Sequence, residues 1–142
     1  MKRGMRQDEP YSHTEVEIIE IKALLTESYG VSLKPFNWRL ALTENWIYAS
    51  RYLEPLEYFT DRVHLWRDAS GQLMAFVIRE TDWFNIQVDY DHRSLESEIF
   101  DWVENHPMPG QKNFNTMVYD WDIERQKLLS ERGYQNLGAI ED

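Results

Sequence analysis

Residues 63–80, VHLWRDASGQLMAFVIRE, decide the fold of this 142-residue chain. In the first five, Val63–Arg67, side chains alternate along the chain as they do on the two faces of a β-strand. The run DASG at 68–71 is a tight connection that contains glycine, and an apolar second strand resumes over Leu73–Arg79. This stretch therefore predicts an antiparallel hairpin.

Strand and helix patterns alternate after the hairpin. Apolar runs predict strands at 83–88 and 114–119, and helical stripes predict helices at 94–105 and 123–132. A strand, a helix and a strand in this order almost always form a right-handed crossover between parallel strands. Residues 137–140 would begin one more strand. We therefore expect an α/β (α+β) fold with a mixed sheet, antiparallel first and parallel later, and helices on both faces.

Helical patterns precede the hairpin. The run SHTE at 12–15 fits the Ser-x-x-Glu capping box, and apolar residues at helical spacing follow it as far as Gly30. A second helix is predicted at 38–53, and Pro55 ends it and opens a short further helix. The chain has no repeat and no linker, so we expect one domain over 1–142. Its helical part would span about 12–61 and its sheet-forming part about 62–142.

Charge and composition exclude several classes of function. The chain has 25 acidic and 15 basic residues, a net charge of -10, which argues against nucleic acid and anionic membrane as partners. It has no cysteine, which excludes disulfides and thiolate metal sites. No apolar segment follows the basic start, and no apolar run approaches the ~20 residues that cross a bilayer. We therefore expect a cytoplasmic protein.

Acidic residues follow two of the predicted strands, whereas glycine-rich phosphate loops and the motifs GxSxG and HExxH are absent from the sequence. Asp89 and Asp91 follow one strand, and Asp120 and Asp122 follow the other. At one edge of a sheet, these carboxylates and the aromatic residues beside them could hold an amine by charge and cation–π contact. They could also bind a hard divalent cation, or simply cap the helices that follow. The sequence assigns no metal ligand.

The order of elements resembles the GNAT superfamily of acetyl-CoA-dependent N-acetyltransferases. Three stretches carry the resemblance: VHLWRDASGQLMAFVIRE at 63–80, IQVDYDHR at 86–93 and DIERQKLLSERGY at 122–134. They match, in turn, the second and third strands of that family, its fourth strand, and a helix that ends in Gly-Tyr or Gly-Phe. The resemblance covers residues 63–134 and implies an acyl-CoA N-acyltransferase-like fold, closest to one half of a two-domain GNAT protein.

The resemblance also implies roles for individual residues. In the family, a loop after the fourth strand binds the coenzyme A pyrophosphate through backbone N–H groups at a helix N-terminus. Cofactor-binding residues would be Ile86 and Val88, whose backbone would pair with pantetheine, and Arg93 and Ser94 in the loop. The catalytic base would be Asp89 or Asp120, and the substrate rim would comprise Asp91, Asp122 and Tyr134.

This sequence departs from the family pattern at several positions. Glu96 and Glu98 stand where the coenzyme loop has small residues, and negative side chains there repel a pyrophosphate. Leu129 stands where many members carry a proton-donating Tyr, and the family's Asn falls near Asp122. From these departures we expect acetyl-CoA to bind poorly or not at all.

Two functions of different class follow from these residues. The first is an N-acetyltransferase domain that transfers acetyl from acetyl-CoA to an amine, with weak or lost activity. The second is a non-catalytic GNAT-fold domain that binds, or pairs with another domain or subunit. An unrelated acidic metal-binding protein is a third interpretation. The family closes its sheet with one or two more strands, so we expect a second GNAT-like half, or self-association through the open sheet edge.

Overall fold

The structure, a computed structural model, describes residues 7–31, 37 and 55–138. The helix predicted at 38–53 and the end of the strand predicted at 137–140 lie outside the described residues. Among the described helices, none combines the length and the apolar character needed to cross a membrane.

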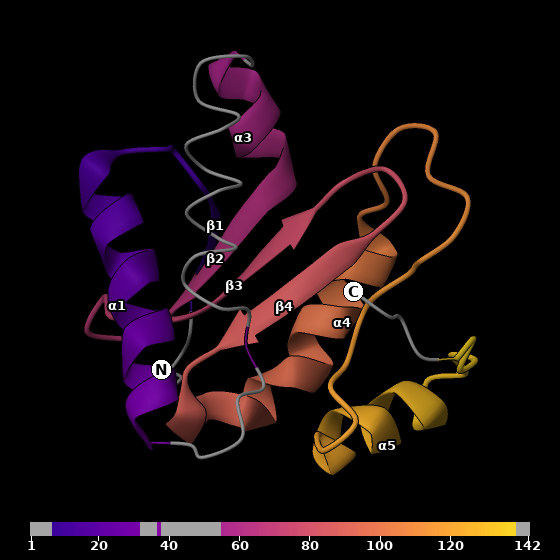
Figure 1. Ribbon diagram of the computed structural model, residues 1–142. Coiled ribbons are helices and arrows are strands. Elements are labelled where there is room, and N and C mark those ends of the chain that lie inside the picture. Colours follow the sequence, from indigo (N-terminus) through magenta and orange to yellow (C-terminus); the bar gives the residue numbers. More distant parts are fainter. Residues whose placement is uncertain (1–6, 32–36, 38–54, 139–142) are drawn as a thin grey trace.

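Four antiparallel strands form one sheet and lie side by side in chain order (Figure 1). They are β1 (Gln7–Pro10), β2 (Val63–Arg67), β3 (Leu73–Arg79) and β4 (Phe84–Val88). The predicted hairpin is confirmed as β2 and β3, in which Leu65 pairs with Phe76. Gly71 in its turn has a φ of 90°, a conformation that favours glycine over residues with a side chain. Strand β1, which pairs with β2, was not predicted.

Helices cover both faces of this sheet, as expected (Figure 1). On one face lie α1 (Glu15–Val31) and α3 (Leu56–Arg62). On the other lies α4 (Glu96–Asn105), which follows the short 3-10 helix η1 (Tyr90–Leu95), and α5 (Ile123–Glu131) packs beside it through Leu129. The α/β class predicted from the sequence is thereby confirmed.

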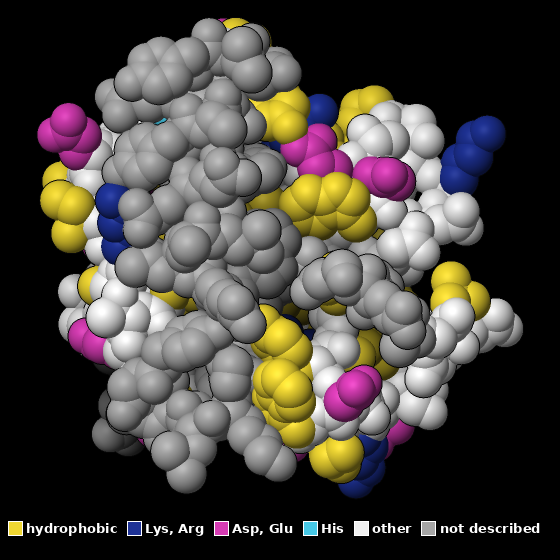
Figure 2. Space-filling view, in the orientation of Figure 1, with side chains coloured by type: hydrophobic (Ala, Val, Ile, Leu, Met, Phe, Trp, Pro, Cys, Tyr) yellow, Lys and Arg dark blue, Asp and Glu magenta, His cyan; other side chains and the backbone are white. Residues whose placement is uncertain are grey.

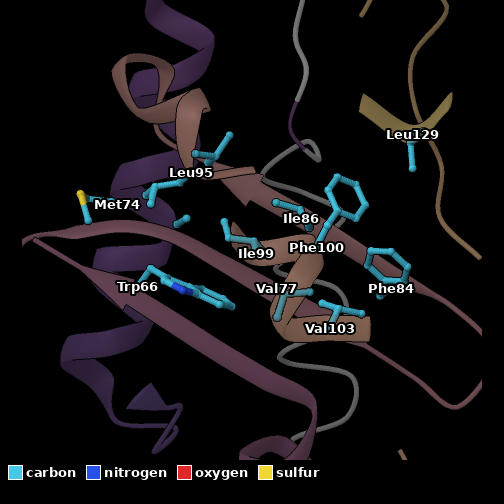
Figure 3. Packing of buried hydrophobic residues seen from close by; sticks show 12 residues of the cluster. Trp66, Met74, Val77, Phe84, Ile86, Leu95, Ile99, Phe100, Val103 and Leu129 are labelled. Carbon is cyan, nitrogen blue, oxygen red and sulfur yellow. The ribbon is translucent and has the colours of Figure 1, made fainter. Parts of the chain in front are cut away.

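Alternate residues of β3 enter two separate hydrophobic clusters. Leu73, Phe76 and Ile78 pack with α1 and α3, whereas Met74 and Val77 pack with α4 in the cluster drawn in Figure 3. All five side chains are at most 7% exposed. Full burial of such a side chain contributes about 1.5–3 kcal/mol. The sheet is therefore fixed from both faces, which holds the carboxyl end of β4 in place.

The N-terminus of α1 is capped two residues later than the sequence pattern predicts. Thr14 Oγ1 accepts the backbone N–H of Glu17 at 3.2 Å. The Glu17 carboxylate in return accepts the N–H groups of Ser12 and Thr14 at 3.0 Å each. The capping box is thus formed by residues 14 and 17, since Glu17 is buried against the start of its helix and Glu15 is exposed.

The parallel strand predicted at 114–119 is not a strand in the structure, and the four described strands pair only antiparallel. This segment meets β4 through one backbone hydrogen bond, from the Phe84 N–H to the Asn115 carbonyl at 2.9 Å. Further along β4, the carbonyl of Ile86 and both polar groups of Val88 bond to side chains instead. Three of the backbone groups that a fifth strand would need are therefore already engaged by side chains.

Candidate functional site

Two buried side chains bond the outward edge of β4. Asn37 Nδ2 donates to the Val88 carbonyl at 2.7 Å, and the Val88 N–H donates to Asn37 Oδ1 at 2.8 Å. Arg125 Nη1 donates to the Ile86 carbonyl at 3.2 Å. Asn37 is 1% exposed and Arg125 4% exposed. The two residues predicted to pair with pantetheine are therefore bonded by side chains of this chain.

A network of four charged residues lies next to this edge. Glu96, in the first turn of α4, accepts Arg93 Nε at 2.7 Å and Arg125 Nε at 2.8 Å, one on each carboxylate oxygen. Arg93 Nη2 also donates to both carboxylate oxygens of Asp122, at 2.7 and 2.8 Å. Glu96 and Asp122 are 3% and 4% exposed. The network joins η1, α4, the start of α5 and, through Arg125, the carbonyl of Ile86 on β4.

The network favours the ionised forms of Glu96 and Arg93. Burial by itself would raise the pKa of Glu96, but the charges and hydrogen bonds of Arg125 and Arg93 hold that pKa below its usual value. Burial would likewise lower the pKa of Arg93, but the hydrogen bonds that Arg93 donates to Glu96 and Asp122, with the charges of these carboxylates, raise it instead. Each buried charge is therefore compensated by a partner of opposite sign.

These residues do not fit acetyl-CoA in the manner that the resemblance implies. A pyrophosphate at the start of α4 would meet the ionised, buried carboxylate of Glu96. A pantetheine chain along β4 would compete with Asn37 and Arg125 for the same backbone groups. The resemblance and the side chains therefore disagree at both parts of the coenzyme.

The acidic residues predicted after β4 lie together at the start of η1. Asp89 precedes its first turn, and the Asp89 Oδ2 lies 2.6 Å from Nδ1 of His92. Its backbone N–H donates to the Met74 carbonyl at 2.8 Å, which ties it to β3. Asp91 is exposed in the first turn of η1, and Ser94 is exposed further along it. The Asp89 carboxylate thus lies beside an imidazole where β4 ends, and the exposed Asp91 follows two residues later.

The acidic residues predicted after 114–119 are placed differently from each other. Asp120 is exposed in the turn before α5, and its carbonyl accepts Gln126 Nε2 at 2.9 Å. Asp122 is buried and caps α5, because it accepts the Arg125 N–H at 3.2 Å. The capping interpretation therefore describes Asp122, whereas Asp120 faces solvent beside the exposed Trp121.

Tyr134, predicted on the substrate rim, lies near the opposite end of α4 from Glu96. Its hydroxyl donates to Glu104 Oε2 at 2.9 Å, and its ring packs edge-on against Phe84 and Phe100. Arg132 Nη2 donates to the other carboxylate oxygen of Glu104 at 2.7 Å. Burial, with the Glu104 hydrogen bond, raises the pKa of Tyr134 above its usual value. In this position Tyr134 fastens the segment after α5 to α4.

The surface of the candidate site also carries exposed hydrophobic side chains. Tyr90, Met117, Trp121 and Ile123 are 42–66% exposed. Figure 2 shows acidic side chains next to hydrophobic ones on one face of the described part of the chain. Within residues 7–31, 37 and 55–138, no three His, Asp or Glu residues form a group that could hold a metal ion.

Two residues of the site, Asn37 and Arg125, were not singled out from the sequence. Asn37 lies 51 residues from Val88, and Arg125 lies 39 residues from Ile86. Local patterning carries no signal for such contacts. The sequence contains one indication for Arg125: it stands three positions after Asp122, the predicted N-cap, and this spacing lets it turn back toward Asp122.

Comparison with known proteins identifies the fold. No family model matches the chain, and no curated protein matches it by sequence. Solved structures do match. A presumed acetyltransferase from Acinetobacter baylyi ADP1 has a TM-score of 0.71 at 12% identity. The match covers 98% of this chain and 84% of the other. Diaminobutyrate acetyltransferase from Paenibacillus lautus, in complex with L-2,4-diaminobutyric acid and coenzyme A, has a TM-score of 0.62 at 12% identity. That match covers 91% of this chain and 75% of the other.

A GNAT-family N-acetyltransferase from Escherichia coli, in complex with coenzyme A, has a TM-score of 0.52 at 16% identity. It covers 87% of this chain and 67% of the other. These proteins share an architecture with this chain and little sequence. The chain has the GNAT fold, as the resemblance of residues 63–134 implies.

Proposed function

We propose that this chain is a GNAT-fold domain with little or no acetyl transfer from acetyl-CoA, which acts as a non-catalytic binding or structural unit. One observation carries the proposal: side chains of the chain itself bond the backbone of β4 at Ile86 and Val88. In an extended ligand that binds like an added strand, main-chain hydrogen bonds supply the affinity. With those groups engaged, acetyl-CoA has to displace Asn37 and Arg125 before it can bind.

The displacement is costly because both side chains are buried. Removing Asn37 leaves buried polar groups unsatisfied at about 1–3 kcal/mol each. Breaking a buried ion pair such as Arg125 with Glu96 costs about 3–5 kcal/mol. A coenzyme would have to offset both terms with its own contacts. The expected affinity for acetyl-CoA is therefore in the millimolar range or weaker.

Calorimetry with acetyl-CoA and an assay of thiol release test the proposal together. The full chain is titrated with acetyl-CoA, and then incubated with acetyl-CoA and L-2,4-diaminobutyric acid while free coenzyme A is measured. We expect no heat of binding at micromolar concentrations and no thiol release above the background without protein. Micromolar binding, or release that depends on the amine, would overturn the proposal.

A second function, binding of a cationic amine without transfer, is favoured by the acidic groups at the end of β4. Asp89 and Asp91 lie together there, and the exposed ring of Tyr90 stands between them in the chain. Carboxylates and an exposed aromatic ring suit an ammonium group. The diaminobutyrate acetyltransferase of this fold binds a diamine. Titration of the wild type and of D91N, which removes one negative charge, with diamines and polyamines tests this function. Equal heats of binding for the two proteins would show that Asp91 does not contribute to amine binding.

The partner of a non-catalytic unit would be a second GNAT-like domain or a second copy of this chain. Exposed hydrophobic side chains such as Met117, Trp121 and Ile123 support an apolar contribution to such an interface. Light scattering after gel filtration distinguishes the two partners. A dimer mass supports a second copy, and a monomer mass leaves the separate GNAT-like domain as the proposed partner.

A further inference from the structure

The cluster around Glu96 has the composition of an anion site. Two guanidinium groups, those of Arg93 and Arg125, converge on one carboxylate in the first turn of α4. Arginine pairs of this kind recognise carboxylates and phosphates, whose oxygens accept several N–H donors at once. The first turn of a helix adds a favourable potential for negative charge. The anion in this arrangement is a residue of the chain.

The burial of Glu96 shows that it is a fixed part of the site. Glu96 is 3% exposed, whereas Glu98, two residues further along the same helix, is exposed. Each oxygen of Glu96 accepts a different arginine, at 2.7 and 2.8 Å. The sequence predicted that both acids disfavour a pyrophosphate. The structure separates them: one is inside the arginine cluster and the other faces solvent.

Glu96 is one of the two buried carboxylates that offset the charges of Arg93 and Arg125. Arg93 and Arg125 are matched by Glu96 and Asp122, and Glu124 reaches Arg93 at 3.4 Å from an exposed position. Without Glu96, the buried Arg125 and the half-buried Arg93 would have Asp122 as their remaining buried carboxylate. A buried guanidinium that has lost its close carboxylate is strongly unfavourable, so Arg125 would then favour an anion taken up from solution.

We propose that Glu96 is an internal ligand that determines specificity: its carboxylate occupies the space between Arg93 and Arg125 and excludes phosphate-bearing molecules from it. The inference rests on the proposed function and names the residue that enforces it. It assigns Asn37 a separate part, because Asn37 bonds the backbone of Val88 on β4. Loss of Glu96 alone should therefore restore anion binding without restoring acetyl transfer.

The test measures the binding of inorganic pyrophosphate to the full chain by calorimetry. The variants are E96A, which removes the carboxylate; E96D, which keeps it; and E98A, the exposed control on the same helix. We expect E96A to bind pyrophosphate about tenfold more tightly than the wild type, or better, which is about 1.4 kcal/mol. E96D and E98A should bind as weakly as the wild type.

A second measurement keeps the test decisive if E96A is unstable. Pyrophosphate at about 10 mM should raise the melting temperature of E96A above that in sodium chloride of equal ionic strength, by linkage of binding to folding. The same addition should leave wild type and E98A unchanged. No tighter binding and no thermal shift in E96A would overturn the role of Glu96. Transfer of acetyl by the wild type would instead overturn the proposed function, so the two failures are distinct.

Discussion

Asn37 and Val88 are joined by two hydrogen bonds across 51 residues of sequence, one from the side-chain amide to the carbonyl and one from the N–H to the amide oxygen. One side chain thus satisfies both polar groups of a backbone position on β4. This geometry is the one that a neighbouring strand or an extended ligand would offer. It makes Asn37 the residue that replaces such a neighbour.

Removal of this amide should destabilise the protein. We expect Asn37→Ala to lower the free energy of unfolding by about 2–4 kcal/mol, because two buried backbone groups would each lose a partner at about 1–3 kcal/mol. Urea unfolding followed by circular dichroism measures the change. The control is Asn113→Ala at an exposed position, where we expect a change within about 0.5 kcal/mol. Equal midpoints for the two variants would contradict the structural role of Asn37.

The packing of α4 on the sheet gives a second prediction. Ile99 is 0% exposed in the cluster of Figure 3, whereas Ile123 is 66% exposed. Ile99→Ala should cost about 2–5 kcal/mol through lost burial and the cavity that remains. Ile123→Ala removes the same atoms at the surface and should cost less than about 1 kcal/mol. Similar losses for both would mean that α4 is not packed as described.

His64 should titrate below its ordinary value of 6.5. Burial lowers the pKa of His64, while the hydrogen bond and charge of Asp8 raise it and Arg79 and His106 lower it. The ring is also stacked on Trp102 at 4.0 Å between centroids. Because the unfolded chain protonates first, stability from this group is complete above pH 6.5 and is lost as the pH falls toward the folded pKa.

Imidazole resonances followed by NMR measure the pKa of His64 directly. Asp8→Asn removes the partner at 2.8 Å and should move the midpoint further down. Asp82→Asn, at an exposed position, is the matched control and should leave it unchanged. A midpoint at or above 6.5 in the wild type would refute the dominance of burial.

The contact between Tyr134 and Glu104 predicts a loss of stability in alkali. The folded pKa of Tyr134 is raised above its ordinary value of 10.0, chiefly by burial. Above about pH 10, the unfolded state therefore binds fewer protons than the native state, and stability falls as the pH rises. Urea unfolding between pH 8 and 11 should show a smaller fall for Tyr134→Phe than for the wild type. Tyr90→Phe, at a position 46% exposed, should retain the wild-type slope.

Local patterning was sufficient for the elements with a strong apolar period. The hairpin of β2 and β3 and the helix α4 match their predicted ranges closely, because each buries alternating or helically spaced side chains on a sheet face. Strand β1 was not predicted because its sequence, QDEP, has no alternation of apolar and polar residues. It is held by pairing with β2, by a hydrogen bond between Asp8 and His64, and by an ion pair between Glu9 and Arg67.

The candidate site was only partly predictable for a different reason. The sequence placed Glu96 at the coenzyme loop and marked it as unfavourable for a pyrophosphate, from charge alone. It could not supply Arg125, which reaches Glu96 and Ile86 from 29 and 39 residues away. Tertiary contacts of this length depend on where α5 packs. The segment 114–119 was misassigned for the same reason, since its period fits a strand but its would-be partner groups are bonded elsewhere.

The side-chain bonds along β4 also bear on assembly. A sheet adds a strand from another molecule only if its edge offers free N–H and carbonyl groups. On β4 the Phe84 N–H bonds to Asn115, the Ile86 carbonyl to Arg125, and both groups of Val88 to Asn37. This edge is therefore protected against recruitment into a larger sheet. Any oligomer that forms would join through side-chain surfaces and should resist growth into open-ended aggregates along β4.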